Sequence, residues 1–554
     1  MPRLHSINCE LSFKHCSVAV RWGVTMKIQC SRIPDFVRLV TEEGIVQAKQ
    51  EKESFSYEDV KLTCSREGDD IGIHLTADHT PVRFLILRFN GRLMNKCRIL
   101  GDAFERSYGN LEWRGINPQR IMPWYLLLSD GNESTGIGVK VRPNAMAFWM
   151  CDAQGITLWL DVRSGAKGVI LSGKELKAAT IVQLESEKEE TPFSFAKRFC
   201  KTLCTDPILP KAPVYGSNNW YYAYGNSSEE EVLSDTSLLA ELTEGLENRP
   251  YMVIDDCWQE LALTKGAAGR PYERGNKKFP DMAGLAQKMK QAGVKPGIWI
   301  RPLETNEAFL GEELRGLRNR NTLDPTVPGA LKLIAEDMRR VTGWGYELVK
   351  YDFATFDFYG GFYPEAIDVL NADGWTLHDR SQTSAEAIKA LYQTLHDNAG
   401  DAVVIGCNVI GHLAAGFIHL HRSGDDTSGN SFDRTVMMGV NTLAFRLPQH
   451  KAFFHMDADC VGITENIPWE LNRRFLELLA ESGTPLFVSA KPSVITEEMK
   501  QDLKAAFKKA SEQKEEMEPL DWFDTVIPSE YKVDGKFIKF DWIGEQGLEK
   551  YCSL

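Results

Sequence analysis

Short runs of alternating apolar and polar residues dominate the first 205 or so residues of the chain. Clusters of Gly, Asn, Asp and Lys separate the runs, and many short strands joined by turn residues are typical of an antiparallel β-sandwich. The runs that we interpret as strands span residues 19–22, 36–40, 60–64, 71–75, 82–89, 136–141, 147–150, 156–162 and 169–171. We assign residues 1–208 to this N-terminal sandwich, whose strands alone fit either a carbohydrate-associated module or a structural brace.

From about residue 210 the pattern changes, because strand-like runs alternate with longer runs of helical spacing. The predicted helices include residues 229–243, 282–292, 330–341 and 384–396. The predicted strands span residues 214–222, 251–258, 295–302, 346–353, 402–409, 417–423, 452–457 and 484–489. Eight such units over roughly 280 residues have the size and order of a (β/α)8 TIM barrel, which we assign to residues 209–493.

An open doubly wound sheet is the structural alternative for this region. The sequence contains no Gly-x-Gly-x-x-Gly and no phosphate-loop motif that would support it. The connection between the fifth and sixth predicted strands is very short, so we expect a degenerate helix there.

The tail, residues 494–554, holds a charged run of helical spacing at 497–516 and two short strand-like runs, 532–533 and 537–541, around an Asp-Gly turn. We interpret it as a C-terminal helix with a small β segment. The expected architecture is therefore multidomain: an N-terminal antiparallel β-sandwich, a central (β/α)8 barrel and a small C-terminal β segment.

Composition and charge narrow the function classes. Hydrophobic residues make up 43% and charged residues 25% of the 554 residues, the balance of a folded globular protein. The net charge is −13, and no Lys/Arg block forms the basic stripe that nucleic-acid binding needs. No apolar stretch approaches the roughly 20 residues of a membrane helix. We expect neither nucleic acid nor a membrane as a partner.

The N-terminus shows no apolar block followed by a small-residue cleavage site, so we expect a cytoplasmic protein. A secreted chain that had lost its signal would look the same. The 12 cysteines are scattered, without a Cys-x-x-Cys pair, and Cys200 and Cys204 have helical spacing but lack partner ligands. We interpret them as reduced thiols rather than zinc ligands.

Acidic residues mark the carboxyl ends of four predicted barrel strands, which is where the active site of such a barrel lies. They are Asp255, Asp256, Asp352, Asp425, Asp426, Asp457 and Asp459. One Asp at a strand end often caps the next helix, but capping explains four such ends poorly. Trp220, Trp258 and Trp299 lie beside them on the first three strands. Carboxylates with Lys, Arg and indole faces suit a sugar, whose hydroxyls need hydrogen bonds and whose apolar face stacks on aromatic rings.

A metal ion is the rival interpretation of this acidic cluster, because magnesium binds carboxylates. The candidate ligands would be Asp255, Asp256, Asp352 and Asp426. Lys350 lies two residues before Asp352, and strand alternation points both side chains to the same face. Its ammonium group would compete with a cation there, so we expect no metal and no cofactor.

Motifs at these strand ends resemble the α-galactosidases of glycoside hydrolase family 36, and the related family 27 shares the Asp-Asp-Cys-Trp stretch. The motifs occupy, in chain order, residues 253–258, 277–280, 296–299, 349–352, 406–407 and 422–426. The resemblance covers the barrel, residues 213–465, and the chain length is similar to that of the shorter bacterial members.

The resemblance implies a retaining mechanism in which Asp352 is the nucleophile and Asp426, four residues after Arg422, is the acid/base. Neighbouring residues of an extended strand face opposite ways, so Asp425 and Asp426 are not both expected to face the sugar. The side chains that the resemblance implies as sugar ligands or pocket walls are Asp255, Asp256, Lys350, Arg422, Cys407, Trp220 and Trp299. Because the sandwich of such enzymes often lends a Trp to the pocket, Trp113 is a further candidate, with a core position as its alternative.

Electrostatics adds two expectations. Lys350 beside Asp352 should lower the pKa of that carboxyl, and burial against the substrate should raise the pKa of the acid/base. In a retaining enzyme the two carboxyl groups lie about 5–5.5 Å apart, against about 6.5–9.5 Å in an inverting one.

The sequence therefore predicts a retaining, exo-acting glycoside hydrolase that releases terminal α-linked galactose from an oligosaccharide or glycoconjugate through a covalent glycosyl–Asp intermediate. An α-N-acetylgalactosaminidase is the alternative, because residues 408–412 do not match the usual family pattern beside the sugar 2-substituent. Another α-glycosidase or a transglycosylase of the same clan also fits, and a catalytically decayed sugar-binding protein is a remote alternative. The oligomeric state is left open.

Overall fold

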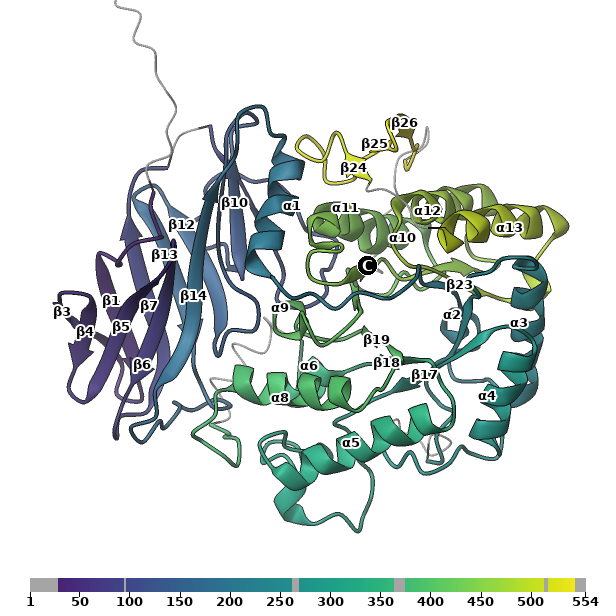
Figure 1. Cartoon of the computed structure of the whole chain (residues 1–554), viewed down its shortest axis with the longest axis horizontal. Coiled ribbons are helices and arrows are strands. Elements are labelled where there is room, and N and C mark those ends of the chain that lie inside the picture. The colour runs from purple at the N-terminus through teal and green to yellow at the C-terminus, as the bar shows by residue number, and fades with distance from the viewer. Residues whose placement is uncertain (1–27, 94–95, 262–268, 363–373, 513–516, 544–554) are drawn as a thin grey trace, which may run out of the picture.

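The computed structural model describes residues 28–93, 96–261, 269–362, 374–512 and 517–543. The predicted strand at residues 19–22 lies outside these residues. Figure 1 shows two β-sheets at the N-terminal side of the molecule, packed beside a parallel sheet that helices surround.

The N-terminal part contains two antiparallel sheets, as the alternating pattern predicts. In sheet order, the first holds β2 (Ile45–Gln47), β1 (Phe36–Thr41), β7 (Val82–Asn90), β13 (Gly155–Asp161), β12 (Met146–Asp152) and β9 (Met122–Pro123). The second holds β3 (Lys49–Glu51), β4 (Ser54–Tyr57), β5 (Val60–Glu67), β6 (Asp70–Thr76), β14 (Leu176–Glu185), β11 (Ser134–Val139), β10 (Tyr125–Ser129) and β8 (Arg98–Gly101). The predicted strand at 169–171 is wrong, because Val169 forms only an isolated bridge with Val82.

Burial alternates along these strands as the sequence pattern requires. In β5, Val60, Leu62 and Cys64 are buried, while Lys61 between them is exposed. Helix α1 (Pro192–Leu203) closes this region, with Thr191 capping its first turn and Phe193, Phe195 and Phe199 among its buried residues.

The second part is a sheet whose strand pairs are all parallel. Its order is β21 (His455–Asp457), β20 (Leu420–Arg422), β19 (Val403–Gly406), β18 (Leu348–Tyr351), β17 (Lys295–Ile300), β16 (Tyr251–Ile254), β15 (Tyr215–Asn218), β23 (Leu486–Ala490) and β22 (Cys460–Ile463). Only Ala458 and Asp459 separate β21 from β22 in the chain. The two outer segments are thus consecutive pieces of one run, and the sheet curls round until it meets itself.

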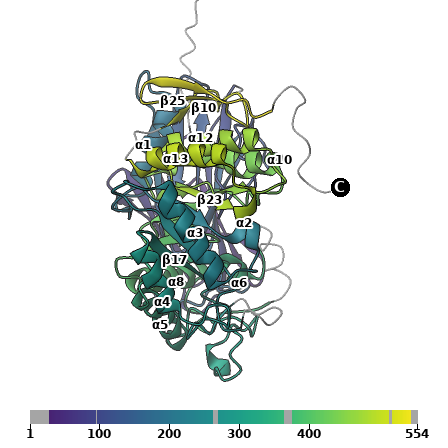
Figure 2. The same ribbon diagram turned by 90° about the vertical axis from the view of Figure 1, so that its right-hand side faces the viewer.

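Seven of the eight predicted barrel strands contain one of these strands, and the eighth, 484–489, overlaps β23, which extends to Ala490. The ninth strand, β22, was not predicted. Helices follow most of the strands. The longer helices are α3 (Glu229–Leu242), α4 (Met282–Gln291), α5 (Pro328–Gly343), α8 (Ser384–Asp397) and α12 (Trp469–Ser482). Figure 2 shows α3 crossing the outside of the sheet. Between β19 and β20 only the four-residue α9 (Gly411–Ala414) forms, as the short connection predicts.

Shorter helical elements lie in the connections between these strands and the longer helices. They are α2 (Trp220–Ala223), η1 (Glu312–Leu314), α6 (Ala354–Tyr359), α10 (Phe432–Thr435), the π-helix η2 (Val436–Asn441), α11 (Thr442–Arg446), η3 (Leu447–Gln449) and η4 (Pro492–Val494).

The C-terminal part consists of α13 (Glu497–Ser511) and a three-stranded sheet of β24 (Glu518–Pro519), β25 (Glu530–Val533) and β26 (Lys536–Lys539). Asp534 and Gly535 form the turn of the β25–β26 hairpin, and both have positive φ angles, 49° and 77°. The segment before β25 packs on both larger parts: Arg98 of the sandwich donates to the carbonyl of Phe523, and Asn441 of the barrel donates to that of Val526 (2.6 Å).

The sandwich and the parallel sheet share a buried boundary. Trp124 stacks on His412 with ring centroids 4.9 Å apart, and His412 contacts the carbonyl oxygen of Val139 at 2.7 Å. Arg446 binds Asp102 at 2.8 Å. In the part of the chain that the structure describes, no helix has the length and apolar character needed to span a bilayer.

Candidate active site

The predicted carboxylates come together because parallel strands present their carboxyl ends at one mouth. Asp255 directly follows β16 and Asp352 directly follows β18. Lys350 in β18 reaches Asp255 across the intervening β17, with Nζ 2.7 Å from Oδ2. The polar side chains at the ends of β16 and β18 thus form one cluster.

Asp255 is fixed on both of its oxygens. Its Oδ2 accepts hydrogen bonds from Asn218 Nδ2 (2.6 Å) and Lys350 Nζ (2.7 Å), while Oδ1 accepts the backbone N–H of Asp256 (2.9 Å). Burial by itself would lower the pKa of Lys350, but the Asp255 carboxylate and, more weakly, Asp352 raise it well above its usual value. Lys350 is therefore an ammonium ion bonded to Asp255, whereas we expected it to act chiefly on Asp352.

Asp352 lies at the start of the loop after β18 and is buried. Its Oδ1 accepts the backbone N–H of Phe353 (2.7 Å), and Trp299 Nε1 lies 3.3 Å from Oδ2. Phe353 has a positive φ of 56°, a strained value that turns the chain sharply after the carboxylate. Trp299 was expected to wall the sugar, but its ring is buried and its indole N–H is directed at Asp352 instead.

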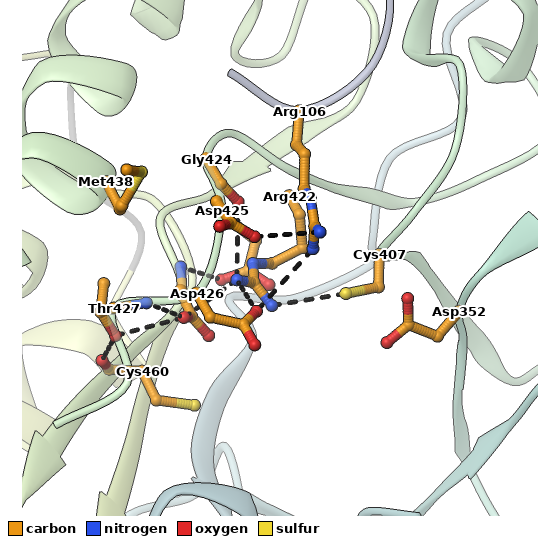
Figure 3. A network of polar contacts seen from close by, with 12 residues as sticks. Arg106, Asp352, Cys407, Arg422, Gly424, Asp425, Asp426, Thr427, Met438 and Cys460 are labelled. Carbon is orange, nitrogen blue, oxygen red and sulfur yellow. Dashed lines mark hydrogen bonds and ion pairs between the residues drawn. The ribbon is translucent and has the colours of Figure 1, made fainter. Parts of the chain in front are cut away.

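Arg422, the last residue of β20, is the centre of the polar network in Figure 3. Its guanidinium binds Asp459 (2.9 Å) and Asp426 (3.1 Å), and Nη1 lies 3.4 Å from the Cys407 sulfur. Burial favours neutral Arg422, but the acidic neighbours, Asp459 foremost, together outweigh burial and raise the pKa of Arg422 well above its usual value. The cation is permanent and ties the ends of three strands together.

Asp426 is the open carboxylate of the network, with its side chain 39% exposed although Arg422 beside it is buried. Burial tends to raise the pKa of Asp426, but Arg422, Arg106 and Lys350 together lower it below its usual range. In the unliganded site Asp426 is therefore ionised at neutral pH, and the expected rise of its pKa on burial against the substrate stays a prediction.

The sandwich contributes a cation to the site that the sequence analysis missed. Arg106 binds Asp425 (2.9 Å) and reaches to 3.8 Å from Asp426. Backbone bonds fix its segment, because Ser107 N–H donates to Ser423 (2.9 Å) and Asp425 N–H donates to Ser107 (2.9 Å). Arg106 therefore enters the barrel mouth on a short stretch of strand pairing between the two domains.

Trp113, the expected contribution of the sandwich, lies elsewhere. Its ring packs against Trp522 and Phe523 of the C-terminal part, with centroids 5.4 and 4.9 Å apart. The core alternative is therefore the correct reading of this residue. The only signal in the sequence for Arg106 is that it lies seven residues before Trp113, in the same segment of the sandwich.

The loop after β20 owes its shape to a glycine. A Cβ atom on Gly424 would lie 2.1 Å from the carbonyl oxygen of Met438, so only glycine lets the loop pass against the π-helix η2. Asp425, the next residue, faces Arg106 and Arg434 (2.7 Å), whereas Asp426 faces Arg422. The main partners of the two adjacent acids thus differ, although Arg106 lies within 3.8 Å of both.

Asp256, Trp220 and Lys350 are the partly exposed members of the predicted sugar-binding set. Burial raises the pKa of Asp256 to about 7, because the hydrogen bonds from Gln259 (2.8 Å) and the backbone of Cys257 (2.6 Å) compensate only in part. Near neutral pH this carboxyl can either donate a hydrogen bond or accept one. Cys407, by contrast, is buried with its thiol against Arg422.

Asp459 organises the site although it received no role from the sequence. It occupies the break between β21 and β22 with a positive φ of 71°. Its Oδ2 accepts from Arg422 and from the backbone of Thr427 (2.8 Å), and it is also bound by the Tyr221 hydroxyl. The Asp-x-Asp spacing after the seventh strand is the signal that points to it. Among the described residues, no group of three or more His, Cys, Asp or Glu side chains has a metal-binding arrangement.

The architecture and the site define a barrel with an N-terminal sandwich and an acidic mouth, and comparisons with known proteins agree on that fold. The α-galactosidase of Thermus thermophilus, solved in complex with p-nitrophenyl α-D-galactopyranoside, aligns with a TM-score of 0.57 and 16% identity over 91% of this chain and 98% of that one. The GH36 α-galactosidase AgaA of Geobacillus stearothermophilus aligns with a TM-score of 0.53 and 12% identity, over 86% and 75% of the two chains.

A sequence relative points the same way over a shorter stretch. The probable α-galactosidase B of Talaromyces emersonii is 28% identical over 145 residues, which are 26% of this chain and 28% of the fungal protein. No family model matches the sequence. The resemblance to family 36 that the strand-end motifs carry is confirmed at the level of the fold.

Proposed function

We propose that this protein is a retaining, exo-acting α-galactosidase of the family 36 type. The observation that carries the proposal is the pairing of a buried acid, Asp352, with an open acid, Asp426, at one barrel mouth lined by the Lys350–Asp255 ion pair and by Arg422. The matches to α-galactosidases, one of them holding stachyose, support the same substrate class.

In the proposed reaction, a carboxylate oxygen of Asp352 attacks the anomeric carbon as the bond to the leaving oxygen breaks. Asp426 is ionised in the unliganded site and takes up a proton as burial against the substrate raises its pKa. It gives that proton to the leaving oxygen, and a galactosyl ester remains on Asp352. Asp426, now ionised, then takes a proton from a water molecule that attacks the anomeric carbon, and galactose leaves with its α configuration retained. The N–H groups of Trp299 and Phe353 hold the attacking carboxylate in position.

The sugar-binding residues follow from the same network. Asp255, Asp256 and Lys350 would bind ring hydroxyls, with Lys350 held in place by its bond to Asp255. Arg422 and Cys407 would lie near the 2-position, and Trp220 would offer its partly exposed face to the ring. All cysteines among the described residues are free thiols, which supports a reducing, cytoplasmic compartment.

Nitrophenol release from p-nitrophenyl α-glycosides tests the proposal directly. The panel holds the α-galactoside, the α-N-acetylgalactosaminide, the α-glucoside and the β-arabinopyranoside. We expect turnover of the α-galactoside above all others, with α-galactose as the first product seen by NMR. Preference for the N-acetylgalactosaminide would establish the alternative function, and β-galactose as first product would exclude retention.

Arg106→Gln should move the alkaline limb of the kcat profile, which reports the enzyme–substrate complex, to higher pH by about one unit, because a cation 3.8 Å from Asp426 favours its ionised form. Without that charge the pKa of Asp426 rises, so the acid keeps its proton to a higher pH. The measurement is the pH profile for a galactosyl disaccharide, whose poor leaving group needs the proton.

Arg106→Lys keeps the charge and should keep the wild-type limb. Arg88→Gln is the matched structural control, because Arg88 is equally buried (12% exposed, against 10% for Arg106) and binds Asp152 within the sandwich. An Arg106→Gln enzyme that loses activity with an unmoved limb would show that Arg106 acts on structure alone.

A further inference from the structure

Tyr224 is an exposed aromatic residue held in a strained conformation at the barrel mouth. It directly follows α2, has a positive φ of 45° and is 49% exposed. A non-glycine residue with such a φ costs free energy, and such residues cluster where function requires a fixed geometry.

The hydroxyl of Tyr224 is bonded to the loop that carries Asp426. It donates to the carbonyl oxygen of Ser428 (3.0 Å) and accepts from Asn430 Nδ2 (3.2 Å). The Asn430 oxygen in turn accepts from Asn466 Nδ2 (3.0 Å), in the loop after β22. The ring therefore bridges loops that follow three different strands, and its polar end is already used. What remains for a ligand is the flat apolar face.

The ring also lies on the side of the site where a leaving group must sit. Ser428 is two residues after Asp426, and the negative charge of Asp426 contributes to raising the pKa of Tyr224, although burial contributes more. On its other side Tyr224 contacts Trp220, with ring centroids 5.6 Å apart and planes at 59°. Since Asp426 is the proposed proton donor, the group that receives the proton lies next to this pair of rings.

We propose that Tyr224 is the platform of a leaving-group subsite that binds a second pyranose ring through its apolar face. The inference rests on the proposed function and deepens it: the substrate is an α-galactosyl oligosaccharide rather than a galactoside of a linear alcohol. A pyranose presents a face of C–H groups that packs on an aromatic ring, and a tethered ring loses little conformational entropy when it binds.

Two substrates separate this subsite from the galactose subsite. In an α-galactosyl-glucose disaccharide the leaving group is a ring, whereas α-galactosyl fluoride has none. Tyr224→Ala should lower kcat/KM for the disaccharide about tenfold or more and leave that for the fluoride within about twofold. Tyr224→Phe keeps the ring but loses its tether, so its loss on the disaccharide should be smaller than that of Tyr224→Ala.

Phe537→Ala is the matched control, because Phe537 is an exposed aromatic (78%) of β26 in the C-terminal sheet and should affect neither substrate. If Tyr224→Ala lowers kcat/KM equally for the disaccharide and the fluoride, or for neither, the proposal that Tyr224 binds the leaving group is wrong. If the wild-type enzyme turns over neither substrate, the proposed function itself fails, and the two failures are thereby distinguishable.

Discussion

Replacing Asp352 by Asn should lower kcat on every α-galactoside by at least about a thousandfold, because a neutral amide cannot form the glycosyl ester. The substitution changes little else. The Asn side-chain oxygen can still accept the backbone N–H of Phe353, and the Lys350–Asp255 ion pair does not involve position 352. We therefore expect a folded protein that binds galactose without turning it over, measured by stopped assays and by thermal shift with galactose.

A buried carboxylate five residues away separates the chemical effect from the cost of removing a charge. Asp357 is buried and binds Arg301 at 2.6 Å. Asp357→Asn should lower the melting temperature more than Asp352→Asn, because it leaves Arg301 with a weaker partner. Its kcat, however, should fall far less than that of Asp352→Asn. Equal losses of rate in the two variants would contradict the role of Asp352.

The covalent step can be observed as well as inferred. A fluorinated α-galactosyl fluoride that forms the intermediate faster than it breaks down should leave a galactosyl ester on one peptide, which mass spectrometry can identify. We expect that peptide to contain Asp352. Labelling at another carboxylate would reassign the nucleophile.

The parallel sheet and its acidic edge could be predicted from the sequence because both depend on local patterns. Each predicted barrel strand is an apolar run, and Asp255 and Asp352 follow the strands directly. The carboxyl ends of parallel strands share one edge, so local placement was enough to bring these acids together. The short connection between β19 and β20, which holds only α9, followed from the small number of residues between the two predicted strands.

What could not be predicted depends on contacts between distant segments. Lys350 is two residues from Asp352 but binds Asp255, 95 positions away, because the curl of the sheet brings the two strands close. Arg106 reaches Asp425 only because Ser107 pairs with the loop after β20. The lowered pKa of Asp426 in the unliganded site depends on Arg422 and on these two cations, and Arg106 was not predicted to lie at the site. Trp113, which we expected at the sugar site, instead packs on Trp522 and Phe523 of the C-terminal part, and this contact is also distant in sequence.

Replacing Asp426 by Ala should divide substrates according to their leaving group. For a galactosyl disaccharide we expect kcat/KM to fall about a thousandfold or more, because its alkoxide leaving group needs a proton. For α-galactosyl fluoride, whose fluoride ion leaves without a proton, the rate of the first step should fall much less. The fold should survive, since Arg422 keeps Asp459 (2.9 Å) as its partner.

Azide makes this assignment specific, because the anion can enter the space that the carboxylate leaves. In Asp426→Ala it should restore turnover of the fluoride and yield α-galactosyl azide, since attack on the intermediate comes from the face opposite Asp352. Asp425→Ala is the matched control: that carboxylate is bound by Arg106 and Arg434 and should give no azide product. A β-galactosyl azide from Asp426→Ala would mean that the two acids have exchanged roles. The anomer of one small product therefore decides which carboxylate attacks and which one carries the proton.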